Sequence, residues 1–167
     1  MSQATLMTRV ETLGSATRTE GIDVRDLSVD DLDDLARLYL RSYAPGVAVD
    51  TFDEAYDEME MSFSGAFGRP APGGFLGAHC EGRLVGVIMT VLDAPFDDVP
   101  DGPFVIELFV HPKYRGRGIA TSLLAAVAEA QEARGAQSLA LRVDLVDAAD
   151  AARLYRTLGF TEHEEVR

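Results

Sequence analysis

Apolar residues recur at helical spacing in four stretches of this 167-residue chain. Residues 29–43 carry Leu32, Leu35 and Leu38 on one face, and Ser28 precedes them as a helix N-cap. The same spacing predicts helices over residues 51–63, 118–134 and 147–158. Gly135 and Gly159 directly follow the last two helices and predict where they end.

Shorter apolar runs, rich in branched residues, indicate strands. They cover residues 22–25, 75–80, 83–92, 103–110, 138–144 and 161–166. Glu81 and Gly82 separate two of these runs, so a tight hairpin turn is expected there. Residues 65–74 and 93–102 are rich in turn-forming residues and are expected to be loops.

Residues 1–20 are mixed and polar. They are expected to form a flexible, loosely ordered leader, with at most a short helical turn from Leu6 to Leu13. Residues 21–167 are expected to form one domain with the element order βααβββαβαβ. This order favours a mixed α/β fold (α+β in part), with a mixed central sheet and helices on both of its faces.

The composition narrows the classes of function. Hydrophobic residues make up 47% and charged residues 26% of the chain, which is typical of a globular protein. The net charge of −13 argues against nucleic-acid binding and suits a cationic substrate, although solubility alone would also account for it. Cys80 is the sole cysteine, and His79 and His163 lack partners at metal-ligand spacing, so no metal is expected.

Two further patterns concern the surroundings of the protein. No apolar run approaches the roughly 20 residues of a transmembrane helix. The N-terminal residues lack the basic segment and apolar run of a signal peptide. We therefore expect a cytoplasmic protein with no membrane partner.

Residues 107–121 pass from a predicted strand, through a glycine-rich turn, into a predicted helix. Gly116 and Gly118 remove side chains where an anion would approach the unpaired amides of the helix N-terminus. Arg115 and Arg117 add cationic donors, so the turn predicts a phosphate site. It lacks the Lys-Ser/Thr of a P-loop, and Thr121 breaks the dinucleotide fingerprint. A turn that serves only packing is the alternative.

Two motifs resemble the GNAT superfamily of acetyl-CoA-dependent N-acetyltransferases. Arg115, Gly118 and Ala120 match its hallmark Arg/Gln-x-x-Gly-x-Gly/Ala, and residues 151–160 match its Ala-x-x-Leu-Tyr-x-x-x-Gly-Phe signature. The resemblance implies a GNAT-type fold and transfer of an acetyl group from acetyl-CoA to a primary amine by direct attack. A non-catalytic acyl-CoA-binding regulatory module of the same fold is the alternative.

The resemblance also implies where acetyl-CoA lies. In this family the coenzyme lies between two splayed parallel strands, and here the backbone of Leu108, Phe109 and Val110 would contact its pantetheine arm. The diphosphate would rest on the main-chain amides of Arg115, Gly116, Arg117, Gly118, Ile119, Ala120 and Thr121. Ala148 stands where the family often has an asparagine that contacts the cofactor.

Two residues are the catalytic candidates. Tyr155 occupies the position at which the family often has its general acid, and its alternative role is that of a core aromatic. Glu107 lies in an apolar strand, where burial would raise its pKa toward that of a general base. The alternative for Glu107 is a structural partner of a loop amide or an arginine, and Asp144 and Asp147 are weaker candidates for the base.

The acceptor pocket of the family is usually walled by its first two helices. Tyr43, Phe52 and Tyr56 are therefore expected to bind the substrate. The many acidic residues around them suit a cationic amine such as a polyamine, an aminoglycoside or a protein N-terminus, unless they simply face solvent. The acceptor, a small molecule or a peptide, is not identified by the sequence. A homodimer is expected only by analogy with the family.

Overall fold

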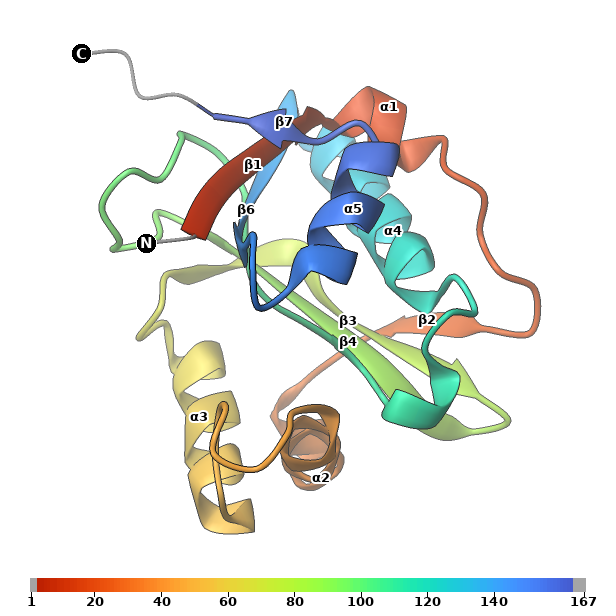
Figure 1. The fold of residues 1–167 in the computed structure, drawn as a ribbon, viewed down its shortest axis with the longest axis vertical. Helices are drawn as coiled ribbons and strands as arrows, with labels where there is room; N and C mark the ends of the chain where they lie inside the picture. Colours follow the sequence, from red (N-terminus) through yellow and green to blue (C-terminus); the bar gives the residue numbers. More distant parts are fainter. Residues whose placement is uncertain (1–2, 164–167) are drawn as a thin grey trace.

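The structure, a computed structural model, describes residues 3–163. Within these residues the chain forms one seven-stranded sheet in the order β2-β3-β4-β5-β6-β1-β7 (Figure 1). The strands are β1 Gln3–Arg9, β2 Asp23–Asp26, β3 Arg69–Cys80, β4 Arg83–Leu92, β5 Phe104–Val110, β6 Ser138–Asp144 and β7 Thr161–Glu162. The α-helices are α1 Val10–Gly14, α2 Leu32–Ser42, α3 Phe52–Ser64, α4 Ile119–Ala133 and α5 Ala149–Thr157.

Helices cover both faces of the sheet, as the sequence predicted. Figure 1 shows α2 and α3 on one side and α1, α4 and α5 on the other. Because strand side chains alternate, β4 supplies both cores: Val87 and Met89 pack with α2 and α3, whereas Ile88 packs with α4. The fold is therefore a mixed α/β fold with two apolar layers.

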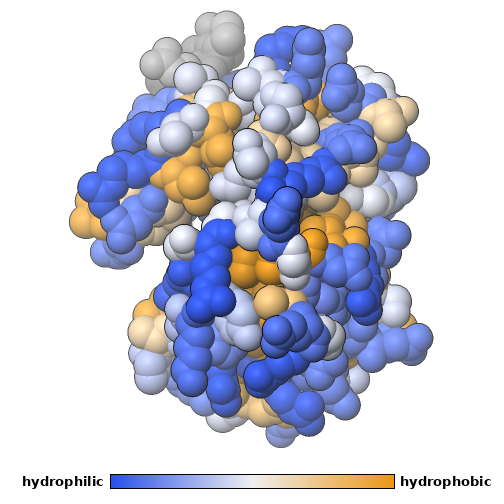
Figure 2. Space-filling view, turned by 90° about the vertical axis from the view of Figure 1, so that its right-hand side faces the viewer, coloured by the Kyte–Doolittle hydropathy of each residue, from blue (hydrophilic) through white to orange (hydrophobic). Residues whose placement is uncertain are grey.

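The outer surface reflects the acidic composition. Figure 2 shows hydrophilic residues over most of one face, with hydrophobic residues gathered near its middle. No helix in residues 3–163 is both long enough and apolar enough to cross a membrane.

The N-terminal segment differs from the prediction. Residues 3–14 form β1 and α1 rather than a loosely ordered leader. β1 pairs antiparallel with β6 along its whole length, and Leu6, Val10 and Leu13 are buried in the core beneath α4 and α5. Leu6 and Met7 point to opposite faces of β1 and pack against different core clusters. The other residues of this short strand are mostly polar, so no apolar run marks it in the sequence.

The remaining differences are smaller. β3 begins at Arg69, inside the predicted loop, because its glycine- and proline-rich start pairs irregularly with β4 between Pro70 and Phe75. The predicted hairpin turn is confirmed, since Glu81 and Gly82 have φ angles of 50° and 79°. β7 ends at Glu162, and the predicted continuation over residues 164–166 lies outside the described residues.

Candidate active site

β5 and β6 separate after a short parallel pairing. In residues 3–163 the ladder between them contains Phe104 opposite Ala140 and Val105 opposite Leu141. β5 continues to pair with β4 as far as Val110. Beyond Val105, the edge of β5 that faces β6 is therefore left without a ladder in the described structure.

A cavity of about 140 Å³ lies at this gap and is called here the gap cavity. Its lining comes from α2, β5, β6 and α5, and so from both sides of the sheet. The residues are Tyr43, Val105, Ile106, Glu107, Leu108, Leu141, Arg142 and Tyr155. The two catalytic candidates, Glu107 and Tyr155, thus line one cavity, although 48 positions separate them in the sequence.

A β-bulge shapes the floor of the gap cavity. Met89 pairs with Glu107, but the next residue of β4, Thr90, pairs with Val105, so Ile106 is an extra residue on β5. A bulge breaks the strict alternation of a strand and redirects its side chains. As a result Ile106, Glu107 and Leu108 all line the same cavity.

Two tyrosines hold the carboxylate of Glu107. The Tyr39 hydroxyl donates to Oε1 at 3.3 Å, and the Tyr43 hydroxyl donates to Oε2 at 3.2 Å. The pKa of Glu107 is raised to about 7: burial is the main cause, the two phenols act in the lowering direction, and nearby Glu58 adds a smaller raising effect. Burial and the Glu107 charge also raise the pKa values of Tyr39 and Tyr43, so both phenols stay protonated as donors.

Tyr155 faces the gap cavity from α5. Its ring is buried and lies 5.6 Å from the ring of Phe160, measured between centroids. Within residues 3–163 its hydroxyl has no hydrogen-bond partner, and burial raises its pKa to about 12. The ring therefore packs in the core, which is the alternative role considered for Tyr155 from the sequence. Its hydroxyl, in contrast, is free to contact a ligand.

The turn before α4 has the conformation that an anion site requires. Gly116 and Gly118 have φ angles of 76° and 80°, a region that side chains disfavour. No side chain caps α4 at Gly118, and a Cβ added at Gly116 would meet nothing within 4 Å. The amides of the first turn of α4 are thus open to a diphosphate.

The side chains around this turn are arranged differently from the sequence-based picture. The Arg115 guanidinium donates to the backbone carbonyls of Ser42 and Val110, so it ties the turn to α2 and β5 instead of pointing freely at an anion. The Arg117 guanidinium lies 5.0 Å from the ring centre of Tyr114. Two of the three guanidinium nitrogens of Arg115 are therefore engaged by protein carbonyls.

A residue from outside both motifs also holds this turn. The Thr19 hydroxyl donates to the Arg117 carbonyl at 2.8 Å, and the Thr19 amide donates to Ser122 Oγ at 2.9 Å. Thr19 lies in the segment between α1 and β2. The sequence predicted this residue to be part of the loosely ordered leader, residues 1–20. No pattern in the sequence distinguishes it from the neighbouring polar residues.

Of the three predicted acceptor residues, the structure brings only Tyr43 to the gap cavity. Phe52 and Tyr56 pair with each other on α3, with ring centroids 6.1 Å apart, and Arg37 lies 5.9 Å from the Phe52 ring centre. The helical period turns these two rings toward α2 and away from β5. Glu58 of α3 instead lines a second cavity together with residues of β5.

This second cavity, called here the acceptor cavity, has a volume of about 270 Å³. It adjoins the gap cavity, because both are lined by Val105, Ile106, Glu107 and Arg142. Its remaining lining residues are Glu58, Phe67, Phe96 and Phe104. In the sequence, Glu58 is one of many acidic residues near the predicted acceptor pocket. No sequence pattern connects the three phenylalanines with the site.

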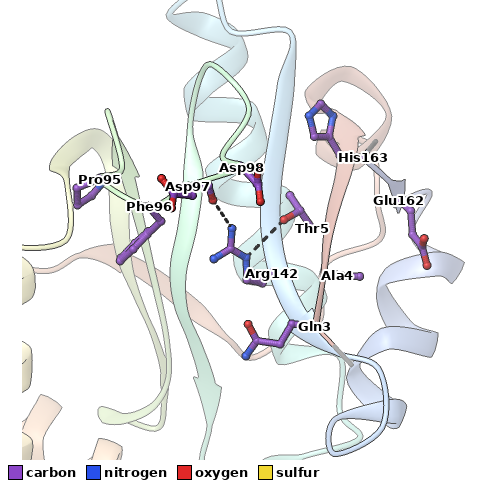
Figure 3. Close-up of a pocket in the computed structure, with 10 residues that line it drawn as sticks. All are labelled: Gln3, Ala4, Thr5, Pro95, Phe96, Asp97, Asp98, Arg142, Glu162 and His163. Carbon is purple, nitrogen blue, oxygen red and sulfur yellow. Dashed lines mark hydrogen bonds between the residues drawn. The ribbon is translucent and has the colours of Figure 1, made fainter. Parts of the chain in front are cut away.

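Arg142 separates the acceptor cavity from a larger hollow. Figure 3 shows its guanidinium at the centre of this hollow, donating to the Asp97 carbonyl at 2.8 Å and toward the Thr5 hydroxyl at 3.5 Å. The hollow measures about 770 Å³, but neither Glu107 nor Tyr155 lines it. Choosing the site by cavity volume alone would therefore select a hollow that holds neither catalytic candidate. In residues 3–163 no three histidine, cysteine or acidic side chains are grouped as metal ligands.

Splayed parallel strands, a bulge beside a buried carboxylate and a glycine turn opening a helix together define an acyl-CoA N-acyltransferase type of fold. Comparisons with known proteins agree. The model of the acetyltransferase (GNAT) family matches residues 32–160. The chain belongs to this family.

Individual relatives are more distant. An uncharacterized N-acetyltransferase of Methanocaldococcus jannaschii is 30% identical over 152 residues, which cover 86% of this chain. A GCN5-related N-acetyltransferase of Sphaerobacter thermophilus superposes with a TM-score of 0.72 at 22% identity over 96% of this chain. An aminoglycoside N-acetyltransferase solved with CoA superposes with a TM-score of 0.66 at 21% identity, covering 91% of this chain and 95% of its own.

The first two of these relatives are longer than this chain. The match covers 62% of the Methanocaldococcus jannaschii protein and 48% of the Sphaerobacter thermophilus structure. Both structural likenesses are below 25% identity, so they establish the fold.

Proposed function

We propose that this protein transfers an acetyl group from acetyl-CoA to a primary amine. The observation that carries the proposal is the gap cavity, in which Glu107 and Tyr155 face one space at the point where β5 and β6 part. The carboxylate of Glu107 suits proton acceptance, and the phenol of Tyr155 suits proton donation. Glu107 reaches the cavity from β5 and Tyr155 from α5.

The residues around the gap fit acetyl-CoA. When bound, acetyl-CoA supplies an activated acyl thioester. The amides from Arg115 to Thr121 would hold its diphosphate, because the glycine turn leaves the start of α4 uncapped. The backbone of Leu108, Phe109 and Val110 would hold the pantetheine arm along the open edge of β5. An N–H on this edge would also stabilise negative charge on the acyl oxygen.

Glu107 would act as the general base. A pKa of about 7 leaves much of its carboxylate ionised at neutral pH and still basic enough to accept a proton from the substrate ammonium, directly or through water, so that the neutral amine can attack. The hydroxyls of Tyr39 and Tyr43 fix one oxygen each, so the carboxylate is oriented before the amine arrives. These two tyrosines are positioning residues in this scheme.

Tyr155 would serve the leaving thiolate. With its pKa raised to about 12, the phenol keeps its proton at neutral pH. Its O–H can therefore donate a hydrogen bond to the sulfur as negative charge develops there. Tyr155 would pass its proton to the sulfur as the C–S bond breaks, and would regain one from the nitrogen, which loses its second proton as the amide bond forms. Glu107 would be left holding the first proton, the one taken from the substrate ammonium.

The test has two parts. Calorimetry should show binding of acetyl-CoA to the purified protein. A thiol-release assay over a panel of amines, including polyamines, aminoglycosides, aryl-alkylamines and peptides, should find at least one acceptor. Acetyl-CoA binding with no turnover on any amine would favour the non-catalytic acyl-CoA-binding module, and no binding would overturn both.

A further inference from the structure

The acceptor cavity is lined by two chemically distinct groups of residues. Glu58 and Glu107 contribute carboxylates that are close enough to interact electrostatically, and neither forms an ion pair with a cation in residues 3–163. Each half-buried carboxylate is thus available to an incoming positive charge. An ammonium held there would place its nitrogen beside Glu107, which is where the proposed reaction needs it.

The other walls of the cavity are apolar and largely aromatic. Phe67, Phe96 and Phe104 line it together with Val105 and Ile106. The rings of Phe96 and Phe104 lie 6.5 Å apart between centroids. Phe96 is 40% exposed on the segment between β4 and β5, so part of its ring is open to a ligand in the cavity.

Arg142 is the remaining polar residue of the lining, and two of its guanidinium nitrogens already donate hydrogen bonds to protein groups. Its guanidinium lies 6.0 Å from the ring centre of Phe104 and donates to the Asp97 carbonyl (Figure 3). Apart from the two carboxylates, the walls thus offer few free polar groups. A ligand rich in hydroxyl groups would lose hydrogen bonds with water there and regain few.

We propose that the acceptor cavity takes a small primary amine with a flat apolar body, an aryl-alkylamine, and disfavours polyhydroxylated amines such as aminoglycosides. The ammonium would lie between Glu58 and Glu107, and the ring would pack against Phe67, Phe96 and Phe104. This inference rests on the proposed function, because it names the substrate class of the same site.

Tryptamine is a suitable probe because the chain contains no tryptophan. Its indole fluorescence can be followed without a tryptophan background, and its anisotropy should rise on binding to the protein, with or without CoA present. Indole-3-propionate, which has a carboxylate in place of the ammonium, should bind at least about tenfold more weakly. Phenylethylamine should displace tryptamine, and kanamycin should not do so at the same concentration.

Matched variants locate the binding. Glu58→Gln should weaken tryptamine binding about tenfold, whereas Glu60→Gln, the same charge change on the exposed side of α3, should not. Phe96→Ala should weaken it about threefold to tenfold. Met61→Ala removes a side chain of similar exposure outside the cavity and should have no effect. Unfolding midpoints of all four variants show whether any loss reflects folding.

The outcomes separate this inference from the proposed function. If acetyl-CoA binds and kanamycin is acetylated in preference to tryptamine, the proposed function stands and the aryl-alkylamine assignment is wrong. Equal effects of Glu58→Gln and Glu60→Gln would also overturn the assignment. If acetyl-CoA does not bind, the proposed function fails, and the tryptamine titration without CoA then reports on the cavity alone.

Discussion

The two sides of the site are built from different kinds of atoms. The proposed diphosphate side would use main-chain amides from one short stretch, Arg115 to Thr121, whose shape depends on the backbone angles of Gly116 and Gly118. The acceptor side uses side chains that α3, β5, β6 and the segment before β5 bring together. The first side is a local conformation, whereas the second exists only when the whole sheet has formed.

This difference bears on how each side can vary. A backbone cradle accepts any sequence that keeps its glycines and the start of the helix, so its ligand stays the same. A cavity made of side chains from several segments changes its ligand when one of those side chains changes. Mutations on the first side should therefore either leave acetyl-CoA binding intact or abolish it. Mutations on the second side should change the affinity for the acceptor by smaller steps.

The largest effect is expected at the diphosphate side. Gly118→Glu places a Cβ 2.5 Å from the Thr19 hydroxyl, forces a side chain onto a φ of 80° and adds a repelling carboxylate. We expect acetyl-CoA affinity to fall about 100-fold or more by calorimetry. Gly135→Glu, with a φ of 94° and open space at the far end of α4, is the matched control and should bind normally.

Glu107 joins the two sides, and its replacement tests the chemistry. Glu107→Gln should lower the acetylation rate about 100-fold while acetyl-CoA still binds. In the wild-type protein the rate should rise as pH increases through about 7, because the base must be ionised, and this step should be absent from the variant. An unchanged pH profile would assign the base to another group.

Glu107 also makes stability depend on pH. Its pKa is raised by folding, so the stability that its protonated form contributes is present below pH 4.5 and lost as pH rises through 7. The free energy of unfolding should fall over this window by on the order of 2 kcal/mol relative to Glu107→Gln. Urea titrations at pH 4.5 and at pH 7.5 measure the difference, and Glu60→Gln controls for loss of a charge.

Tyr155→Phe should have a smaller effect. The change keeps the ring packed beside Phe160 and removes only the hydroxyl. We expect turnover to slow about tenfold and acetyl-CoA affinity to stay within about twofold, since the phenol serves the leaving sulfur. A normal rate would leave Tyr155 as a packing residue alone.

The same contrast decides how much of this molecule the sequence could reveal. The helices, the hairpin at Glu81 and the glycine turn at Gly118 follow from local patterns, and all three are present. Glu107 and Tyr155 could be singled out because both lie in or beside recognisable motifs, and the structure brings them to one cavity. These features need only residues that are close together in the chain.

What the sequence did not reveal depends on tertiary contacts. Tyr39 lies within the predicted helix over residues 29–43, but nothing in the helical pattern shows that its hydroxyl reaches Glu107. The bulge at Ile106 appears only when the β4 and β5 registers are compared. Phe52 and Tyr56 were predicted to bind the substrate because they lie on the second predicted helix. Only the packing of α3 shows that these two rings contact each other and that Glu58 lines the cavity beside β5.

Thr19 provides the smallest and most specific test of the comparison, because it links a segment outside the family match to the local cradle. Thr19→Val keeps the shape of the side chain but removes the hydrogen bond to the Arg117 carbonyl, so the turn should become less well fixed. We expect acetyl-CoA affinity to fall about threefold to fivefold. Thr161→Val, an exposed threonine on β7, should leave calorimetric affinity unchanged. Equal affinities of the two variants would mean that the glycines hold the cradle without support from the N-terminal segment.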